Sequence, residues 1–384
     1  MTTASHRLHG ASIGEPGSRA ALNTPALVLD LDAFEANVLA MAAWARERGV
    51  ALRPHAKTHK SAHVARAQLA AGAVGLCCAK LGEAEALAAE GVTGLHITSP
   101  VVAAPAVARL AALHARAPDL SVVADHPTNI AALAAALPVG GPPLRVLVDV
   151  DPGIHRTGVA SAEAALALAR LISKRPSLSY AGVQFYCGVQ QHIASYAERR
   201  AAIEDRTAFL STVLRALADA GLPAPLVTGG GTGTHRIDAD LGVLTELQVG
   251  SYVFMDREYG DCDLDGSGPG GAPFRTALAI DATVVSANTP GLATLDAGLK
   301  AFAADAGPPP ILAGAAPGSR YRFMGDEHGL VMAPPGGSAP PLGARVSLAA
   351  PHCDPTVNLY DALHVVRGDA LVDIWPVTAR GRSA

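Results

Sequence analysis

The densest group of reactive side chains lies in the eight residues from Arg53 to Lys60, which include one arginine, two histidines and two lysines. This segment begins in the last two residues of a strand candidate at 51–54. In a barrel of parallel strands, the catalytic groups lie at the carboxyl ends of the strands. A lysine at such an end can form an imine with a carbonyl compound. Lys57 and Lys60 are the two candidates, and a solvated basic turn is the alternative explanation.

A glycine-rich loop, TGGGTGT at 228–234, follows another strand candidate. Its backbone N–H groups and hydroxyls suit a phosphate, and the late loops of such barrels are common phosphate sites. By itself the loop is equally well a flexible connection. The next strand candidate ends in the small residues 250–251. A lysine at one strand end and phosphate donors at two others together predict a site for a phosphorylated aldehyde cofactor.

A third element, Pro351-His352-Cys353-Asp354, lies far along the chain. If this piece is extended, His352 and Asp354 project to the same side and Cys353 faces away, because strand side chains repeat every two residues. An imidazole and a carboxylate suit a divalent ion, and Mg²⁺ or Mn²⁺ fits better than structural zinc. Two ligands leave the shell incomplete, so water or substrate must complete it.

The elements that must position these residues alternate between short apolar runs and helical periodicity from 26 to about 260. The strand candidates are 26–30, 51–54, 74–78, 95–98, 120–124, 144–150, 180–185, 226–228 and 246–249. Helical segments lie between them, at 31–48, 61–71, 82–90, 103–117, 161–174 and 196–220. Eight or nine such units predict a parallel sheet, and the economical closed form is a (β/α)8 TIM-like barrel. A doubly wound open sheet is the alternative.

After residue 260 the pattern changes to a loop rich in Gly and Asp at 262–272, followed by candidate antiparallel strands. These strands are 276–285, 342–349 and 364–376, the last with a turn at 367–369. We therefore expect a barrel at 26–260 and an antiparallel β domain made of 1–25 and 261–384. The second domain would carry His352 and Asp354 to the barrel.

Composition narrows the function classes. The 384 residues include 30 Lys and Arg against 34 Asp and Glu, a net charge of −4, which argues against a nucleic-acid or anionic-membrane partner. The five cysteines form no CxxC pair, which favours a reduced, cytoplasmic compartment. No apolar run approaches the ~20 residues that span a bilayer, and no signal sequence is visible. A small molecule is the expected partner.

Taken together, these segments resemble the D-threonine aldolase and D-serine dehydratase-like family, fold-type III pyridoxal phosphate (PLP) enzymes related to alanine racemase. The resemblance spans nearly the whole chain. Its motifs are TPA at 24–26, RPHAKTHK at 53–60, DPGIHRTG at 151–158, QFYCGVQQH at 184–192 and PHCD at 351–354. It implies an alanine racemase-like barrel, an antiparallel β domain that covers the barrel mouth, and a homodimer.

The resemblance also implies roles for individual residues. Lys57 looks like the Schiff-base lysine, whereas Lys60 should point elsewhere, and Arg156 looks like the residue beside the phenolic oxygen of the cofactor. Gln248 stands where alanine racemases place an arginine against the pyridine nitrogen, and a neutral partner would leave that nitrogen unprotonated, which argues against racemase chemistry. The remaining phosphate and ring contacts are expected to be Gly230, Gly231, Thr232, Gly250, Ser251 and Tyr259.

The metal pair indicates which branch of the family this chain resembles. His352 and Asp354 match the HxD pair of the aldolases, whereas D-serine dehydratases show His-x-Cys, and Cys353 falls one residue short of that position. His192 is placed to accept the proton of a substrate β-hydroxyl, directly or through a metal-bound water. Tyr186, close by in the same motif, is counted with it as catalytic.

The expected activity is therefore a PLP- and divalent-metal-dependent lyase. It would cleave a β-hydroxy-D-amino acid of the D-threonine, phenylserine or 3-hydroxy-D-aspartate type to glycine and an aldehyde. A β-carboxylate would need an extra cation, for which His155, Lys300 and Arg322 are candidates. One alternative is a D-threo-3-hydroxyaspartate or D-serine dehydratase that gives a 2-oxo acid and ammonia. Another is a PLP-binding homeostasis protein without turnover.

Other reactive residues are assigned to structure. His55, His59 and His63 recur every four residues and are interpreted as groups behind the site or in solvent rather than as a second metal site. Cys77 and Cys78 lie in a strand candidate and are expected in the core. The acidic segment 262–265 is interpreted as a solvated linker.

Overall fold

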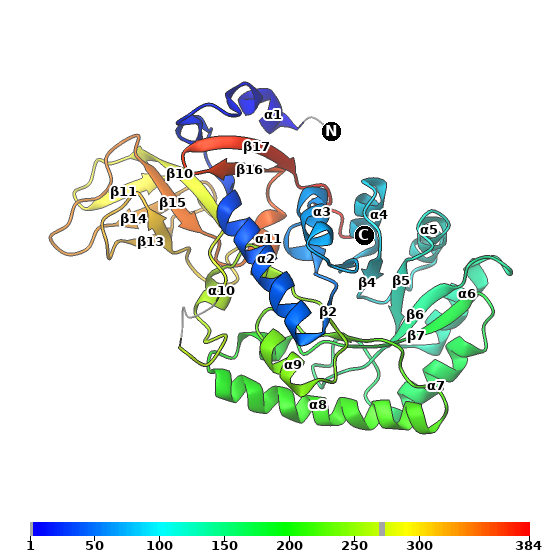
Figure 1. The fold of residues 1–384 in the computed structure, drawn as a ribbon. Helices are drawn as coiled ribbons and strands as arrows, with labels where there is room; N and C mark the ends of the chain where they lie inside the picture. Colours follow the sequence, from blue (N-terminus) through cyan, green and yellow to red (C-terminus); the bar gives the residue numbers. More distant parts are fainter. Residues whose placement is uncertain (1–2, 269–272) are drawn as a thin grey trace.

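The computed structural model describes residues 3–268 and 273–384. Figure 1 shows two bodies, a barrel surrounded by helices and a sheet of antiparallel strands, with helix α2 (Leu31–Arg48) running between them. The predicted combination of a TIM-like barrel and an antiparallel β domain is confirmed. Part of the predicted loop at 262–272, namely 269–272, lies outside the described residues.

Eight parallel strands form the barrel sheet in the described part of the chain, in the order β2-β9-β8-β7-β6-β5-β4-β3. Hydrogen bonds from Val74 N–H to the Leu52 carbonyl, 2.8 Å, and from Cys77 N–H to the Pro54 carbonyl, 2.8 Å, join the first strand to β3 and close the barrel. The open-sheet alternative is therefore wrong. The strands are β2 (Ala51–Leu52), β3 (Leu76–Cys78), β4 (Leu95–Ile97), β5 (Ser121–Ala124), β6 (Leu144–Asp149), β7 (Leu178–Phe185), β8 (Val227–Gly229) and β9 (Glu246–Leu247).

Helices cover the outside of the barrel because each presents one apolar stripe to the strands. In α7 (Ala162–Ser173) the buried residues are Ala165, Leu168, Ala169 and Ile172, which share one helical face. The other covering helices are α3 (Ala62–Ala70), α4 (Leu81–Ala89), α5 (Ala104–His114), α6 (Pro127–Ala136), α8 (Tyr196–Asp219) and α9 (His235–Leu241).

The second sheet has nine strands in the described part of the chain, along the path β13-β14-β11-β10-β1-β16-β17, with β15 on β10 and β12 on β15. Its strands are β1 (Ala26–Asp30), β10 (Leu278–Ser286), β11 (Leu292–Leu295), β12 (Ile311–Ala313), β13 (Arg320–Phe323), β14 (Gly329–Met332), β15 (Arg345–Ala349), β16 (Ala362–Arg367) and β17 (Ala370–Pro376). Each of the three predicted antiparallel segments contains strand in the structure.

Strand β1 corrects the sequence analysis, which counted 26–30 as the first barrel strand. It pairs antiparallel with β10 and parallel with β16, and so belongs to the second sheet. Its first four residues are buried. A short apolar run of this kind suits either a barrel or the middle of a second sheet, so its composition cannot distinguish them. The expected domain start at residue 26 therefore placed one strand in the wrong body.

The N-terminal segment packs on the second sheet, where the N–H of Gly14 bonds to the Leu371 carbonyl at 2.8 Å and Arg19 pairs with Asp281 at 2.9 Å. It contains α1 (Ala4–His9) and two short 3₁₀ turns, Gly10–Ser12 and Ser18–Ala21. Among the described residues, no helix is both long enough and apolar enough to cross a membrane.

Candidate active site

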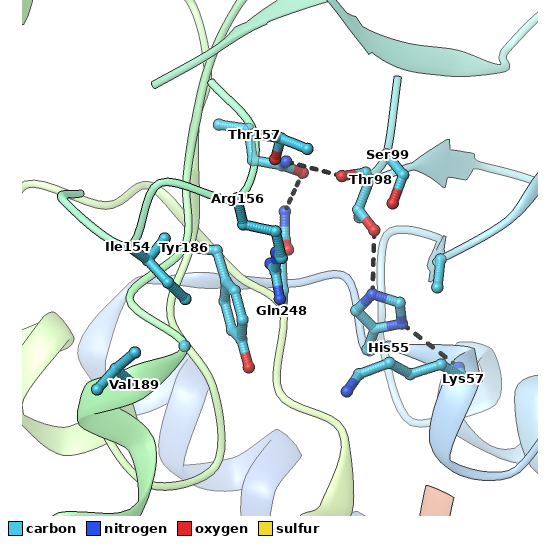
Figure 2. Close-up of a pocket in the computed structure, with 13 residues that line it drawn as sticks. His55, Lys57, Thr98, Ser99, Ile154, Arg156, Thr157, Tyr186, Val189 and Gln248 are labelled. Atoms are coloured by element: carbon cyan, nitrogen blue, oxygen red, sulfur yellow. Dashed lines mark hydrogen bonds between the residues drawn. The ribbon is translucent and has the colours of Figure 1, made fainter. Parts of the chain in front are cut away.

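A cavity of about 390 Å³ opens at the carboxyl ends of the barrel strands (Figure 2). Its walls come from the segments that follow β2, β3, β4, β6, β7 and β9, as expected for the site of a parallel barrel. The lining residues are His55, Lys57, Ala79, Thr98, Ser99, Ile154, Arg156, Thr157, Gln184, Tyr186, Gly188, Val189 and Gln248.

Lys57 enters this cavity from a 3₁₀ turn, Ala56–Thr58, that follows β2. The turn begins because the Nδ1 atom of His55 accepts the Lys57 N–H at 3.3 Å, and the other ring nitrogen of His55 lies 3.2 Å from the Thr98 hydroxyl. Figure 2 shows the Lys57 side chain passing beneath the His55 ring. Burial holds the pKa of His55 well below its usual value, so this imidazole is a neutral support.

Lys60, the rival for the imine, points to another place. Its backbone is left-handed, with φ of 49°, and its ammonium bonds to the buried Glu83 carboxylate at the start of α4. Lys60 lies just before α3 and points away from the cavity toward Glu83. Of the two candidates, Lys57 is the lysine that lines the cavity.

Arg156 and Tyr186 form the opposite wall of the cavity from two neighbouring strand ends. The Arg156 guanidinium carbon lies 5.5 Å from the centre of the Tyr186 ring, a cation–π contact that fixes both groups. The predicted residues Lys57, Arg156 and Tyr186 are thus brought together, and Gln248 lines the same cavity.

The glycine-rich loop at 228–234 packs against Gln191 and lies next to the 3₁₀ turn Ser251–Val253. A Cβ at Gly230, whose φ is +67°, would lie 2.5 Å from the Asp238 carboxylate, so only glycine fits there. Two of its N–H groups are already used, because Gly231 donates to Thr234 and Gly233 donates to Gln191. The loop is therefore less open to a phosphate than its composition predicts.

Gly250 and Thr232 are the better placed of the predicted phosphate residues. A Cβ at Gly250 would lie 2.8 Å from the Thr58 hydroxyl oxygen, which is buried and has no hydrogen-bond partner among the described residues. The Thr232 hydroxyl accepts the Tyr252 N–H at 3.1 Å, so it is held beside the turn that begins at Ser251. Gly250 thus packs directly against the turn that carries Lys57, and the buried Thr58 hydroxyl beside it is a donor that suits a phosphorylated cofactor.

The metal pair lies in the second domain, at the start of the short helix α11 (Cys353–Val357). His352 itself is extended, with φ of −140° and ψ of 122°, but Asp354 lies in the first turn of the helix, so the condition of an extended segment is met only in part. Asp354 nevertheless faces the barrel, where its Oδ2 atom lies 2.7 Å from the Nζ atom of Lys57. Burial would raise the pKa of Asp354, but the Lys57 ammonium outweighs burial and lowers it to about 2.

His352 is oriented by a carboxylate that sequence reasoning missed. Its Nδ1 atom lies 2.7 Å from Oδ2 of Asp305, in the loop before β12. Burial opposes the charged imidazole, but the hydrogen bond to Asp305 and the carboxylates of Asp354, Asp256 and Glu258 outweigh it and raise the pKa of His352. No motif marks Asp305, since it lies in an irregular loop 47 residues before His352 in the chain.

Two further residues that the sequence did not indicate come from α10 (Arg257–Gly260). Asp256 caps this helix at the Tyr259 N–H, 3.2 Å, and also accepts the Cys353 N–H at 2.9 Å, so one carboxylate ties α10 to α11. Glu258 lies between two imidazoles, 3.8 Å from Nε2 of His192 and 3.7 Å from Nδ1 of His352.

His192, the predicted proton acceptor, lies at the edge of this cluster rather than among the lining residues of the cavity. Its ring packs on Tyr259 with 4.6 Å between the ring centres. Burial lowers the pKa of His192, which keeps the imidazole neutral and able to accept a proton near pH 7. Tyr259 contacts His192, and its expected contact with the cofactor stays a prediction.

A divalent ion fits His352 and Asp354 in part. The pair offers an imidazole and a carboxylate, and Oδ1 of Asp354 is buried without a hydrogen-bond partner among the described residues. Within 3–268 and 273–384, no group of three or more His, Cys, Asp or Glu side chains has the arrangement of a metal site. Two protein ligands are consistent with the expected incomplete shell.

The remaining predicted residues lie elsewhere. His59 is buried rather than solvated, and burial lowers its pKa to about 3, whereas Cys77 and Cys78 are in the core as expected. The cations suggested for a β-carboxylate are not at the cavity. His155 is 83% exposed and bonds to Asp151, Lys300 pairs with Glu327 on the surface, and Arg322 contacts Met324.

Comparisons with known proteins agree with this arrangement. Two family models match, the alanine racemase N-terminal domain over 29–258 and a putative serine dehydratase domain over 277–366. A D-threonine aldolase from Arthrobacter sp is 43% identical over 97% of this chain and 96% of its own length. A 3-hydroxy-D-aspartate aldolase from Paracoccus denitrificans is 37% identical over 94% of this chain and 93% of its own length.

Among solved structures, D-threonine aldolase from Filomicrobium marinum is 39% identical, with a TM-score of 0.89, and the match covers 94% of this chain and 97% of that one. The two family models together span 29–258 and 277–366, which include Lys57, Arg156, His192, His352 and Asp354. This chain therefore belongs to the D-threonine aldolase and D-serine dehydratase-like family of fold-type III pyridoxal phosphate enzymes, which share the alanine racemase-like barrel.

Proposed function

We propose that this protein is a carbon–carbon lyase that uses PLP and a divalent metal to cleave a β-hydroxy-D-amino acid into glycine and an aldehyde. The observation that carries the proposal is the contact between the two bodies of the fold, where Lys57 of the barrel lies 2.7 Å from Asp354 of the second domain. This contact brings the residue for a carbonyl cofactor and a residue for a metal to one place.

The cofactor would be held by residues that line the cavity and, on the phosphate side, by residues outside its lining. Lys57 would supply the amine, Arg156 with its neighbour Tyr186 forms one wall, and the Thr58 hydroxyl beside Gly250 suits the phosphate. Further contacts to the phosphate would come from Gly230, Gly231, Thr232 and Ser251. The chemistry that the cofactor supplies when bound is delocalisation of the electron pair left on Cα.

The proton of the substrate's β-hydroxyl would pass to His192, whose imidazole is neutral and lies next to Glu258. His352 and Asp354 would hold the metal, Mg²⁺ or Mn²⁺, which supplies Lewis acidity at the hydroxyl oxygen. As the O–H bond breaks, its electron pair becomes the second bond of the aldehyde carbonyl. The Cα–Cβ bond breaks at the same time, and its electron pair stays on Cα. One proton taken up at Cα completes glycine, so the cleavage is neither an oxidation nor a reduction.

The substrate's β-substituent is expected to be uncharged. Ile154 and Val189 give the cavity an apolar side next to Tyr186. The three cations suggested for a β-carboxylate lie on the surface with other partners. D-threonine and phenylserine types are therefore favoured over 3-hydroxy-D-aspartate.

The products test the proposal. Incubation with D-threonine or 3-hydroxy-D-aspartate, PLP and Mn²⁺ should release glycine and an aldehyde. A 2-oxo acid with ammonia would indicate a dehydratase instead, and retained PLP without turnover would indicate a homeostasis protein.

Three accompanying expectations stay predictions: a homodimer, a cytoplasmic location, and the division into 26–260 and 1–25 with 261–384, from which β1 already departs. Light scattering during gel filtration tests the dimer directly. A monomer of full activity would show that the site is complete within one chain.

A further inference from the structure

The floor of the cavity is a series of hydrogen bonds whose direction can be assigned from both ends. At one end, the amide nitrogen of Gln184 donates to the Thr98 carbonyl oxygen at 3.0 Å and to Oδ1 of Asp149 at 2.9 Å. A backbone carbonyl can only accept, so the nitrogen of this amide must face Thr98. The orientation of the Gln184 side chain is thereby fixed, with its oxygen on the other side.

The Gln184 oxygen then needs donors, and it has two. Nε2 of His96 lies 3.1 Å from it, and the amide nitrogen of Gln248 lies 3.2 Å from it. His96 serves as a donor there because its Nδ1 atom lies 2.9 Å from the Ser121 hydroxyl, which can supply the hydrogen on that side. Because the Gln184 oxygen accepts, the amide nitrogen of Gln248 must face it.

The second hydrogen of the Gln248 amide is also used. It is donated to the Thr228 hydroxyl oxygen at 3.1 Å, and that hydroxyl in turn donates to Glu246 at 2.9 Å. Glu246 forms an ion pair with Arg53 at 3.0 Å, so this end too can only accept. Turning the Gln248 amide over would set its oxygen against the oxygen of Gln184. The Gln248 oxygen is therefore the polar atom that this side chain presents to the cavity.

We propose that Gln248 acts toward the bound cofactor as a hydrogen-bond acceptor and thereby favours a protonated ring nitrogen. The inference rests on the proposed function, since it requires PLP on Lys57. Of the polar groups of the cofactor, the phosphate and the phenolic oxygen carry negative charge, and the ring nitrogen is the one that can donate a hydrogen to a neutral acceptor. The lone pair of an unprotonated ring nitrogen would face a lone pair of the Gln248 oxygen, and the two acceptors would repel each other.

This result reverses the expectation drawn from residue type alone, that a neutral partner leaves the nitrogen unprotonated. An amide has both a donor and an acceptor, and its surroundings decide which one is available. A protonated ring withdraws electrons from Cα more strongly than a neutral ring. Gln248 would therefore assist the cleavage although it carries no charge.

The test is the ¹⁵N NMR shift of PLP labelled at the ring nitrogen and reconstituted into the full-length protein near neutral pH. Labelled PLP free in acidic and in alkaline solution supplies the two reference shifts. The inference predicts a shift close to the acidic reference. A shift close to the alkaline reference would overturn it, while a protein that forms no imine with PLP would overturn the proposed function instead.

Two variants assign the effect to Gln248. Gln248→Leu removes the acceptor but leaves the Gln184 oxygen with His96 and the Thr228 hydroxyl with Glu246, so its shift should move toward the alkaline reference. Ser99→Ala, which changes another lining residue outside these hydrogen bonds, should keep the acidic shift. An acidic shift retained in Gln248→Leu would show that another group holds the proton. If Gln248→Leu does not fold, the wild-type shift alone decides.

Discussion

Nζ of Lys57 lies 2.7 Å from Oδ2 of Asp354, and this ion pair joins the barrel to the second domain. The Asp354 carboxylate raises the pKa of Lys57, and the Lys57 ammonium lowers that of Asp354. The same two residues are the ones proposed to hold the cofactor and the metal. Each of the two side chains therefore has the other as its ionic partner as long as neither cofactor nor metal is bound.

The first prediction concerns the coupling of the two ligands. When PLP takes the Lys57 amine, Asp354 loses its cation and becomes a better ligand, so PLP-loaded protein should bind Mn²⁺ roughly 5- to 150-fold more tightly than cofactor-free protein. Isothermal titration calorimetry measures both affinities. By the reciprocity of linked binding, Mn²⁺ should tighten PLP binding by the same factor.

Lys57→Ala is the control for this coupling. The variant should give a colourless protein without a borohydride-reducible imine, and without PLP it should bind Mn²⁺ about as tightly as the loaded wild type. Equal Mn²⁺ affinity of loaded and cofactor-free wild-type protein would contradict the coupling. A reducible imine in Lys57→Ala would contradict the lysine assignment.

The second prediction concerns His192. Replacing it with Gln should lower kcat for cleavage by about 10²- to 10⁴-fold, because the acceptor of the β-hydroxyl proton is lost. The absorbance of bound PLP should not change, since His192 does not line the cavity. His155→Gln is the matched control, because His155 is 83% exposed and bonded to Asp151. An active His192→Gln enzyme would assign the proton to another base.

The third prediction concerns Asp305, which lies 2.7 Å from Nδ1 of His352. A carboxylate on one ring nitrogen fixes a histidine so that the other nitrogen can bind metal, and its loss typically costs 10- to 100-fold in affinity. Asp305→Ala should weaken Mn²⁺ binding by about that factor. Asp261→Ala is the control and should leave Mn²⁺ binding unchanged, because Asp261 is a surface aspartate paired with Arg257. Unchanged affinity in Asp305→Ala would remove Asp305 from the metal site.

The fourth prediction is a pH dependence of stability. Burial raises the pKa of Asp238 to about 7, whereas an unfolded aspartate has a pKa of about 3.9. Between these values the folded protein binds more protons than the unfolded chain, so stability falls as pH rises, by up to about 1.4 kcal/mol per unit. Asp238→Asn should lack this loss. Urea unfolding at pH 5 and pH 7.5 measures it, and parallel curves for both proteins would refute it.

Much of the fold followed from the sequence because its signals are local. Apolar runs indicated the barrel strands, and helical periodicity indicated the helices between them. The position of Lys57 just after β2 correctly indicated that it lines the cavity. Strand β1 was misplaced because a short buried run carries no information about which sheet receives it. His352 and Asp354 were expected on one face of a strand, but they lie at the start of a helix.

The missed residues share one property. Asp256, Glu258 and Asp305 stand in no motif, and they reach the site through contacts between segments as far as 97 residues apart in the chain. The acceptor role proposed for Gln248 depends on contacts that no motif marks. Its residue type was known, but the direction of its amide depends on Thr98, Gln184 and Thr228 and cannot be inferred from the sequence alone.

Product analysis by NMR in D₂O, with D-threonine, PLP and Mn²⁺, tests directly whether this protein cleaves the Cα–Cβ bond. We expect equal amounts of acetaldehyde and of glycine that carries deuterium at Cα, because Cα takes its new proton from solvent. Lys57→Ala should form neither product. Formation of a 2-oxo acid and ammonia by the wild-type protein would show a dehydratase instead, and cleavage that persists in Lys57→Ala would show that Lys57 does not hold the cofactor.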